Sequence, residues 1–129
     1  MQTAPDYMQE KFTVLIVEDE PIVRFCAAEM LSDHGFDVVE SAAADHALEI
    51  LESRSDVAVL FTDIEMPGTL DGSALAMIVR QRWPQIRVVM TSGRVRPTPG
   101  ELPPRAQFLP KPYLPDQLVA ALVVMADPA

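Results

Sequence analysis

The chain has 129 residues, of which 19 are acidic and 10 are basic, so its formal net charge at neutral pH is −9. A chain of this length fits one domain, and we expect no second folded effector domain. The negative charge would be repelled by the phosphates of a nucleic acid, and the longest apolar run, Leu118 to Ala126, has nine residues where a bilayer requires ~20, so we expect neither a nucleic-acid nor a membrane partner.

The N-terminal segment is polar, and residues 1–11 are predicted to be a tail. The sequence of residues 1–12, MQTAPDYMQEKF, lacks the apolar region of a signal peptide. We therefore expect a cytoplasmic protein. The single cysteine, Cys26, suits a reducing compartment because it cannot form an internal disulfide, and it lies within a helical pattern as a small apolar residue.

After the tail, short apolar runs alternate with amphipathic segments. Strands are predicted at Val14–Val17, Asp37–Glu40, Val57–Thr62, Val88–Thr91 and Gln107–Leu109. Helices are predicted at Pro21–His34, Ala44–Arg54, Gly72–Trp83 and Leu114–Met125. Because nearly continuous apolar strands separated by helices are typical of a parallel sheet covered on both faces, the pattern predicts a doubly wound α/β fold of about five βα units.

Proline and glycine mark the ends of several elements. Pro21 suits the first turn of a helix, and Gly35 favours a left-handed residue just after the same helix. After the fourth strand, the segment SGRVRPTPGELPPRA contains four prolines where a fourth helix should lie. Since a proline inside a helix costs ~3 kcal/mol, we expect a loop or at most one helical turn there.

Acidic residues follow the first and third predicted strands. Glu18 and Asp19 end the first strand, and Asp63 ends the third. If the strands follow the flavodoxin-like order 2-1-3-4-5, these carboxylates meet at the edge where open parallel sheets bind ligands. Their mutual repulsion would favour a hard divalent cation such as Mg²⁺, which prefers oxygen ligands. Glu18, Asp19 and Glu20 could instead be only the polar start of a helix, whose dipole stabilises acidic side chains, and this stretch alone does not decide.

Two further polar residues follow the fourth and fifth strands. Ser92 lies in VVMTSGR and Lys111 in FLPKPY. The first and third strands thus end in acidic residues, the fourth in a hydroxyl and the fifth in an amine. With the acids in LIVEDEP and LFTDIEMPG, this ordered set resembles the CheY-like receiver domain of two-component response regulators. The resemblance covers residues 12–126, which we take as the domain, and leaves 127–129 as a C-terminal tail.

The resemblance implies a role for each residue of the set. Asp63 matches the phosphoacceptor, which takes a phosphoryl group from a partner's histidine, and Lys111 and Ser92 match the lysine and the hydroxyl that bind phosphoryl oxygens. The family's ligands for Mg²⁺, for which Mn²⁺ is an alternative, match three carboxylates and one backbone carbonyl: Glu18, Asp19, Asp63 and the carbonyl of Glu65. The first acid of the pair is Glu here, where Asp is commoner.

The resemblance also implies a conformational switch. Ser92 matches a hydroxyl that moves toward the phosphoryl group, and Phe108 matches a ring that swings inward with it, although Phe108 could equally be an ordinary buried aromatic. The bond between Lys111 and Pro112 matches one that the family keeps cis. The Pro-rich segment Arg94 to Arg105 takes the place of the family's fourth helix, part of its usual signalling face, and the loop MPGTLDG is one residue longer than usual.

Glu65 and Arg94 lie at positions that border the family's site. As an opposite-charge pair they could shield the acyl phosphate from water, and as solvated surface residues they would have no such effect. The rate of phosphate loss from a Glu65→Ala variant would distinguish the two, since an unchanged half-life would exclude shielding.

The last helix suggests a partner contact. Its buried face is predicted to comprise Leu118, Ala121, Leu122 and Met125. Its other sides carry further apolar residues, namely Val119, Ala120, Val123 and Val124. This outer surface favours a homodimer or another partner, although such positions often pack under neighbouring loops.

The implied function is that of a stand-alone response regulator. A histidine kinase or phosphotransfer protein would donate a phosphoryl group to Asp63 in a Mg²⁺-dependent reaction, and the chain would act as a switch rather than as an enzyme on other substrates. Three alternatives are kept: a receiver cut from a hybrid histidine kinase, a pseudo-receiver that binds partners without phosphate, and an aspartate-nucleophile phosphatase. The phosphatase fits poorly because it requires an Asp where Glu65 stands.

Overall fold

The computed structural model describes residues 13–94, 96–97 and 102–126, with side chains up to Leu122. Its strands are β1 (Thr13–Val17), β2 (Asp37–Ser41), β3 (Val57–Asp63), β4 (Arg87–Ser92) and β5 (Gln107–Pro110). The helices in these ranges are α2 (Pro21–Asp33), α3 (Ala44–Ser53), α4 (Gly72–Arg82) and α5 (Pro115–Ala126). Each predicted element is present, and its ends lie within one residue of the predicted ends. The predicted tails lie outside the described residues.

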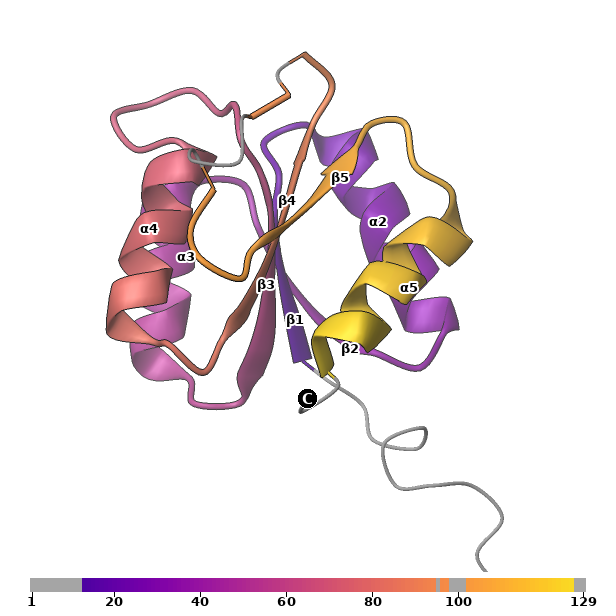
Figure 1. Cartoon of the computed structure of the whole chain (residues 1–129), viewed down its shortest axis with the longest axis horizontal. Coiled ribbons are helices and arrows are strands. Elements are labelled where there is room, and N and C mark those ends of the chain that lie inside the picture. Colours follow the sequence, from indigo (N-terminus) through magenta and orange to yellow (C-terminus); the bar gives the residue numbers. More distant parts are fainter. Residues whose placement is uncertain (1–12, 95, 98–101, 127–129) are drawn as a thin grey trace, which may run out of the picture.

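The strands form one parallel sheet in the order β2-β1-β3-β4-β5. Helices α2 and α5 cover one face of this sheet, and α3 and α4 cover the other (Figure 1). The flavodoxin-like, doubly wound prediction is therefore confirmed. Val17 pairs with Thr62 on β3, and Asp63 pairs with Thr91 on β4, so the carboxyl ends of the central strands lie side by side.

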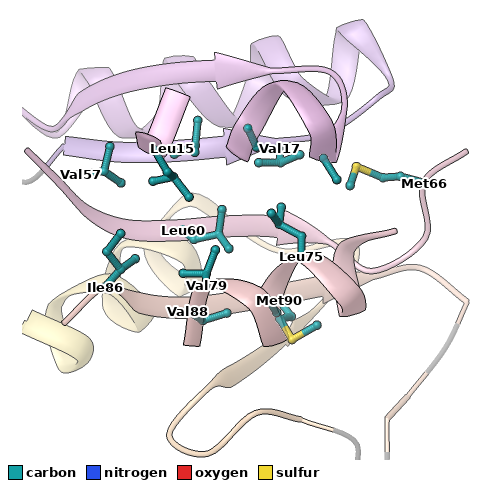
Figure 2. Packing of buried hydrophobic residues seen from close by; sticks show 14 of the residues in the cluster. Leu15, Val17, Val57, Leu60, Met66, Leu75, Val79, Ile86, Val88 and Met90 are labelled. Atoms are coloured by element: carbon teal, nitrogen blue, oxygen red, sulfur yellow. The ribbon is translucent and has the colours of Figure 1, made fainter. Parts of the chain in front are cut away.

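Each face of the sheet packs into an apolar layer. On β1, Leu15 and Val17 face α3 and α4, whereas Val14 and Ile16 face α2 and α5. Figure 2 shows the first layer, in which Leu60 and Val88 of the sheet lie beside Leu75 and Val79 of α4. After Thr13, the residues of β1 are apolar and buried, so the acidic side chains come only where the strand has ended, at the edge of the sheet.

No helix lies between β4 and β5 in the described residues 93–94, 96–97 and 102–106, which form bends and turns. The Pro-rich loop is thus confirmed in this part of the segment, and the label α4 denotes the helix between β3 and β4. Pro21 stands in the first turn of α2, as predicted, and Gly35 has a φ of 89°.

Helix α5 buries part of the predicted face. Leu118 and Leu122 are fully buried, and Ala121 is half-buried. On the other sides, Val119 is half-buried against the core and Ala120 is exposed. The side chains of Val123, Val124 and Met125 lie outside the described residues, so the predicted partner surface stays a prediction.

Helix α2 buries only small residues and one leucine, namely Ala27, Ala28 and Leu31. Cys26, which we placed in this helix as a small apolar residue, is exposed. No helix within the described ranges is both long and apolar enough to cross a membrane.

Candidate functional site

The predicted site residues meet at the carboxyl edge of the sheet. Asp63 and Ser92 are the last residues of β3 and β4, Glu18 follows β1, and Lys111 follows β5. Glu18 and Asp63 are only 4% and 6% exposed, whereas Asp19 is half-buried. Ionised carboxylates at this depth require a nearby positive charge or hydrogen-bond donors.

Lys111 supplies that charge. Its Nζ lies 2.7 Å from Asp63 Oδ2 and 2.9 Å from Glu18 Oε1. The backbone places the lysine, because its N–H donates to the carbonyl of Ser92 at 3.0 Å and continues the β4–β5 pairing. The peptide bond between Lys111 and Pro112 is cis, as predicted.

The pKa shifts follow from this arrangement. Burial raises the pKa of Glu18 above its ordinary value, and the hydrogen bond from Lys111 offsets only part of that rise. Burial acts on Lys111 in the opposite direction, but its hydrogen bonds to Asp63 and Glu18 outweigh it, so the pKa of the lysine lies above its ordinary value. Lys111 is therefore a permanent positive charge at neutral pH.

The three carboxylates fit a divalent cation. Glu18, Asp19 and Asp63 each offer an oxygen, and these oxygens lie within 4.8 Å of one another. Such all-oxygen sets suit Mg²⁺ and Mn²⁺. Glu18 Oε2 also accepts the N–H of Glu20 at 3.2 Å, so each oxygen of Glu18 has a hydrogen-bond donor.

The β3–α4 loop brings Glu65 to the same edge. The N–H of Glu65 donates to Asp63 Oδ1 at 3.1 Å, and its side chain accepts the hydroxyl of Ser92 at 2.9 Å. Ser92 also accepts the N–H of Arg94 at 3.1 Å. An ion pair between Glu65 and Arg94, one of the two interpretations left open by the sequence, is absent among the described residues.

These residues line an open cleft of about 710 Å³, which includes Asp19, Glu20, Asp63, Glu65, Arg94 and Lys111. The cleft gives Asp63 access from outside although the residue is mostly buried. A small, highly charged group could therefore reach its carboxylate.

Phe108 lies on β5 beside Met90 of β4 and is half-buried against the layer formed with α3 and α4. This is the face on which the Ser92 side chain meets Glu65. The inward swing predicted for Phe108 stays a prediction.

Two structural residues were missed at the sequence level. Arg24 donates from Nη1 to the carbonyl of Glu18 at 2.8 Å, and from Nε to Glu40 at 3.3 Å, so it holds the turn that carries the acids. Gly72 lies so close to β3 that a Cβ on it would be 1.7 Å from the carbonyl oxygen of Asp63. A glycine at the start of a helix was the available signal, because glycine is a poor helix former and often marks a close backbone approach.

The parallel sheet with acids, a hydroxyl and a lysine at its carboxyl edge defines a CheY-like receiver domain. The family model described as "Response regulator receiver domain" matches residues 14–123, so the chain belongs to this family. Members of the family bind Mg²⁺ through an acidic pocket, and Glu18, Asp19 and Asp63 form such a pocket here.

Two curated relatives are similar over most of the chain. The sensor kinase CckA of Brucella abortus is 35% identical over 119 residues, which are 89% of this chain and 12% of that protein. The nitrogen assimilation regulatory protein NtrX of Azorhizobium caulinodans is 35% identical over 111 residues, which are 82% of this chain and 24% of that protein. The chain thus spans a quarter or less of the length of these relatives.

Two solved structures share the fold over nearly their whole length. A response regulator receiver protein from Sinorhizobium medicae superposes with a TM-score of 0.84 at 28% identity, covering 91% of this chain and 95% of its own. The receiver domain of the hybrid histidine kinase CckA superposes with a TM-score of 0.76 at 31% identity, covering 89% of this chain and 99% of that domain.

Proposed function

We propose that this chain accepts a phosphoryl group on Asp63 from the histidine of a partner kinase or phosphotransfer protein and signals by a change of conformation. The observation that carries the proposal is the mostly buried Asp63 carboxylate, which opens onto a cleft and lies 2.7 Å from Lys111. A carboxylate that is both accessible and held in one orientation is suited to in-line attack.

The transfer forms an acyl phosphate. One oxygen of Asp63 attacks phosphorus, the phosphorus–nitrogen bond of the donor histidine breaks, and its electron pair stays on the imidazole nitrogen. Lys111, already held beside Asp63, balances negative charge on the transferring group. Mg²⁺ or Mn²⁺, held by Glu18, Asp19, Asp63 and the carbonyl of Glu65, would neutralise further charge on the phosphoryl oxygens.

The switch begins at Ser92. Its hydroxyl turns to donate to a phosphoryl oxygen, and Phe108, half-buried on the neighbouring strand, repacks in response. The Pro-rich loop after β4 replaces a helix as part of the output surface. The chain then acts as a signalling phosphoacceptor in the cytoplasm, with no catalysis on other substrates and no nucleic-acid or membrane partner, and homodimerisation through α5 stays part of the proposal.

A receiver within a hybrid histidine kinase is a second candidate. The similarity to the CckA receiver supports it, because 99% of that domain is covered. The chemistry at Asp63 would be the same, and only the attached domains would differ. A pseudo-receiver is less well supported, since Asp63, Lys111 and Ser92 are all of residue types that can take part in the reaction.

Intact-mass spectrometry tests the proposal. The wild-type chain, incubated with Mg²⁺ and acetyl phosphate, should gain one phosphoryl group, and the Asp63→Asn variant should gain none. Beryllofluoride, which mimics the phosphoryl group, should change the amide NMR spectrum of the wild type alone. Absence of any Asp63-dependent adduct or spectral change would refute the phosphoacceptor role and favour the pseudo-receiver.

A further inference from the structure

The switch hydroxyl is already engaged in the resting structure. Ser92 Oγ donates to Glu65 Oε1 at 2.9 Å, a length typical of a strong hydrogen bond. The acceptor is a carboxylate, so the bond is assisted by charge. The same Glu65 binds Asp63 through its backbone, since its N–H donates to Asp63 Oδ1 at 3.1 Å. One residue therefore connects the phosphoacceptor with the switch hydroxyl.

The backbone of Glu65 has little freedom to move. Its neighbours Ile64 and Met66 are both buried in the apolar layer beneath the loop. Ile64 donates to the carbonyl of Thr91 at 2.8 Å and accepts the N–H of Gly72 at 2.9 Å. The Glu65 side chain is therefore presented to Ser92 from a fixed position at the rim.

A serine hydroxyl has a single proton to donate. If Ser92 gives that proton to Glu65, it cannot give it to a phosphoryl oxygen at the same time. Phosphorylation must therefore break the Ser92–Glu65 bond before Ser92 can report the phosphoryl group. Glu65 and Asp63 line the same cleft. The Glu65 carboxylate therefore also repels a negatively charged phosphoryl group on Asp63.

We infer that Glu65 is a positioning residue that holds Ser92 in the resting orientation and so sets the free energy needed to switch the domain. The inference rests on the proposed phosphoacceptor function and adds its regulation. Removing the Glu65 carboxylate favours the switched state, and retaining an acceptor at this position without charge preserves part of the restraint.

A double-mutant cycle separates the Ser92–Glu65 bond from simple charge repulsion. Dissociation constants for beryllofluoride, with Mg²⁺ present, are measured for wild type, Glu65→Ala, Ser92→Ala and the double variant. Repulsion acts in both backgrounds, but the bond exists only where Ser92 is present. We expect Glu65→Ala to tighten binding about tenfold more in the wild-type background than in the Ser92→Ala background, the low end for a hydrogen bond to a charged acceptor.

Two controls make the cycle specific. Glu20→Ala removes an exposed acid from the same cleft, where its side chain makes no helix-capping bond, so it should tighten binding equally in both backgrounds. Glu65→Gln keeps an acceptor oxygen and should fall between wild type and Glu65→Ala. The amide NMR signal of Arg94, which donates to Ser92 Oγ, should shift toward its beryllofluoride-bound position in Glu65→Ala without ligand.

The outcomes distinguish this inference from the proposed function. If Glu65→Ala changes the dissociation constant of beryllofluoride equally in the two backgrounds, within about threefold, the restraint of Ser92 by Glu65 is refuted. The phosphoacceptor function is not refuted by that result, because beryllofluoride still binds. An unshifted Arg94 amide in Glu65→Ala would also count against it. If the wild type itself does not bind beryllofluoride, the phosphoacceptor function is refuted and this inference with it.

Discussion

An ion pair of 2.7 Å joins Lys111 to Asp63 across 48 positions of the chain. The same ammonium lies 2.9 Å from Glu18, so one cation offsets two buried carboxylates. Because Glu18 follows β1, Asp63 ends β3 and Lys111 follows β5, the pairing depends on the strand order rather than on any local sequence. The energetic consequence is that both carboxylates lose their compensating charge if Lys111 is removed.

Replacement of Lys111 by Met should therefore destabilise the metal-free protein by about 1–3 kcal/mol, the range for leaving a buried polar group without a partner, since the partly exposed Lys111 side chain is in contact with water. Mg²⁺ should recover much of this loss, since a cation among Glu18, Asp19 and Asp63 replaces the missing charge. Urea unfolding with EDTA and with Mg²⁺ measures both quantities. Equal destabilisation under the two conditions would contradict the compensation between lysine and metal.

Arg54→Met is the matched control for this experiment. Arg54 also forms a short ion pair, at 2.6 Å with Asp56, but both side chains are largely exposed and lie outside the cleft. An exposed ion pair contributes little to the free energy of unfolding, because water solvates both charges when the pair is broken. We expect a small change in stability that does not depend on Mg²⁺.

A substitution of Gly72 tests whether the start of α4 positions Asp63. The added methyl of Gly72→Ala would overlap the carbonyl oxygen of Asp63, so backbone must move, and we expect a loss of at least about 3 kcal/mol together with slower phosphorylation by acetyl phosphate. Gly68→Ala in the same loop has open space but a φ of 107°. It should lose about 1–2 kcal/mol through backbone strain and keep its phosphorylation rate. Similar phosphorylation rates in both variants would exclude the positioning role.

The sequence predicts that the site residues lie close together, because each of them stands at the carboxyl end of a strand and these ends share one edge of the sheet. Apolar runs locate the strands, helices between them imply parallel pairing, and Asp63, Ser92 and Lys111 each come where a run stops. The prediction needed no side-chain geometry. A single-residue error at a strand end would still have left these residues on the same edge.

Contacts between side chains could not be predicted in this way. The bond from Ser92 to Glu65 depends on the path of the β3–α4 loop, which Gly72 and two buried apolar neighbours determine. Charge alone suggested an ion pair between Glu65 and Arg94, but the Glu65 carboxylate accepts a hydrogen bond from the Ser92 hydroxyl instead. Likewise, Arg24 reaches the carbonyl of Glu18 only because α2 packs beside β1.

Tyr113 gives a pH dependence that can be measured. It packs edge-on against Phe61, with ring centroids 5.7 Å apart, and burial raises its pKa from 10.0 to about 12. Between these two values the folded state keeps a proton that the unfolded state releases. The contribution of protonated Tyr113 to the free energy of unfolding is therefore fully present below pH 10 and is lost as pH rises toward about 12.

Denaturation of wild type and Tyr113→Phe across this alkaline range provides the measurement. The stability of the wild type should fall more steeply with pH than that of the variant, which has no hydroxyl to ionise. Tyrosinate absorbance should show that the group removed by the substitution is the one titrating near pH 12. Parallel stability curves for the two proteins would show that the Tyr113 hydroxyl ionises as easily in the folded chain as in the unfolded one.

The first turns of α2 present apolar side chains next to the cleft. Ile22 and Phe25 are 77% and 59% exposed, Leu114 at the start of α5 is 66% exposed, and Val23 lines the cleft itself. A protein that delivers a phosphoryl group from its histidine must cover this rim, whereas acetyl phosphate need not. Large exposed aromatic residues commonly carry much of the binding free energy in such contacts.

Phe25→Ser should therefore slow transfer from a phosphorylated histidine phosphotransfer protein that donates to the wild type, by about tenfold for a residue worth more than 1 kcal/mol. Its rate with acetyl phosphate should stay at the wild-type value, because Phe25 lines no part of the cleft. Met77→Ser is the matched control, since Met77 is 44% exposed on α4 on the opposite face of the sheet and should leave both rates unchanged. If Phe25→Ser slows both phosphodonors alike, the residue supports the site itself, and the docking role is wrong.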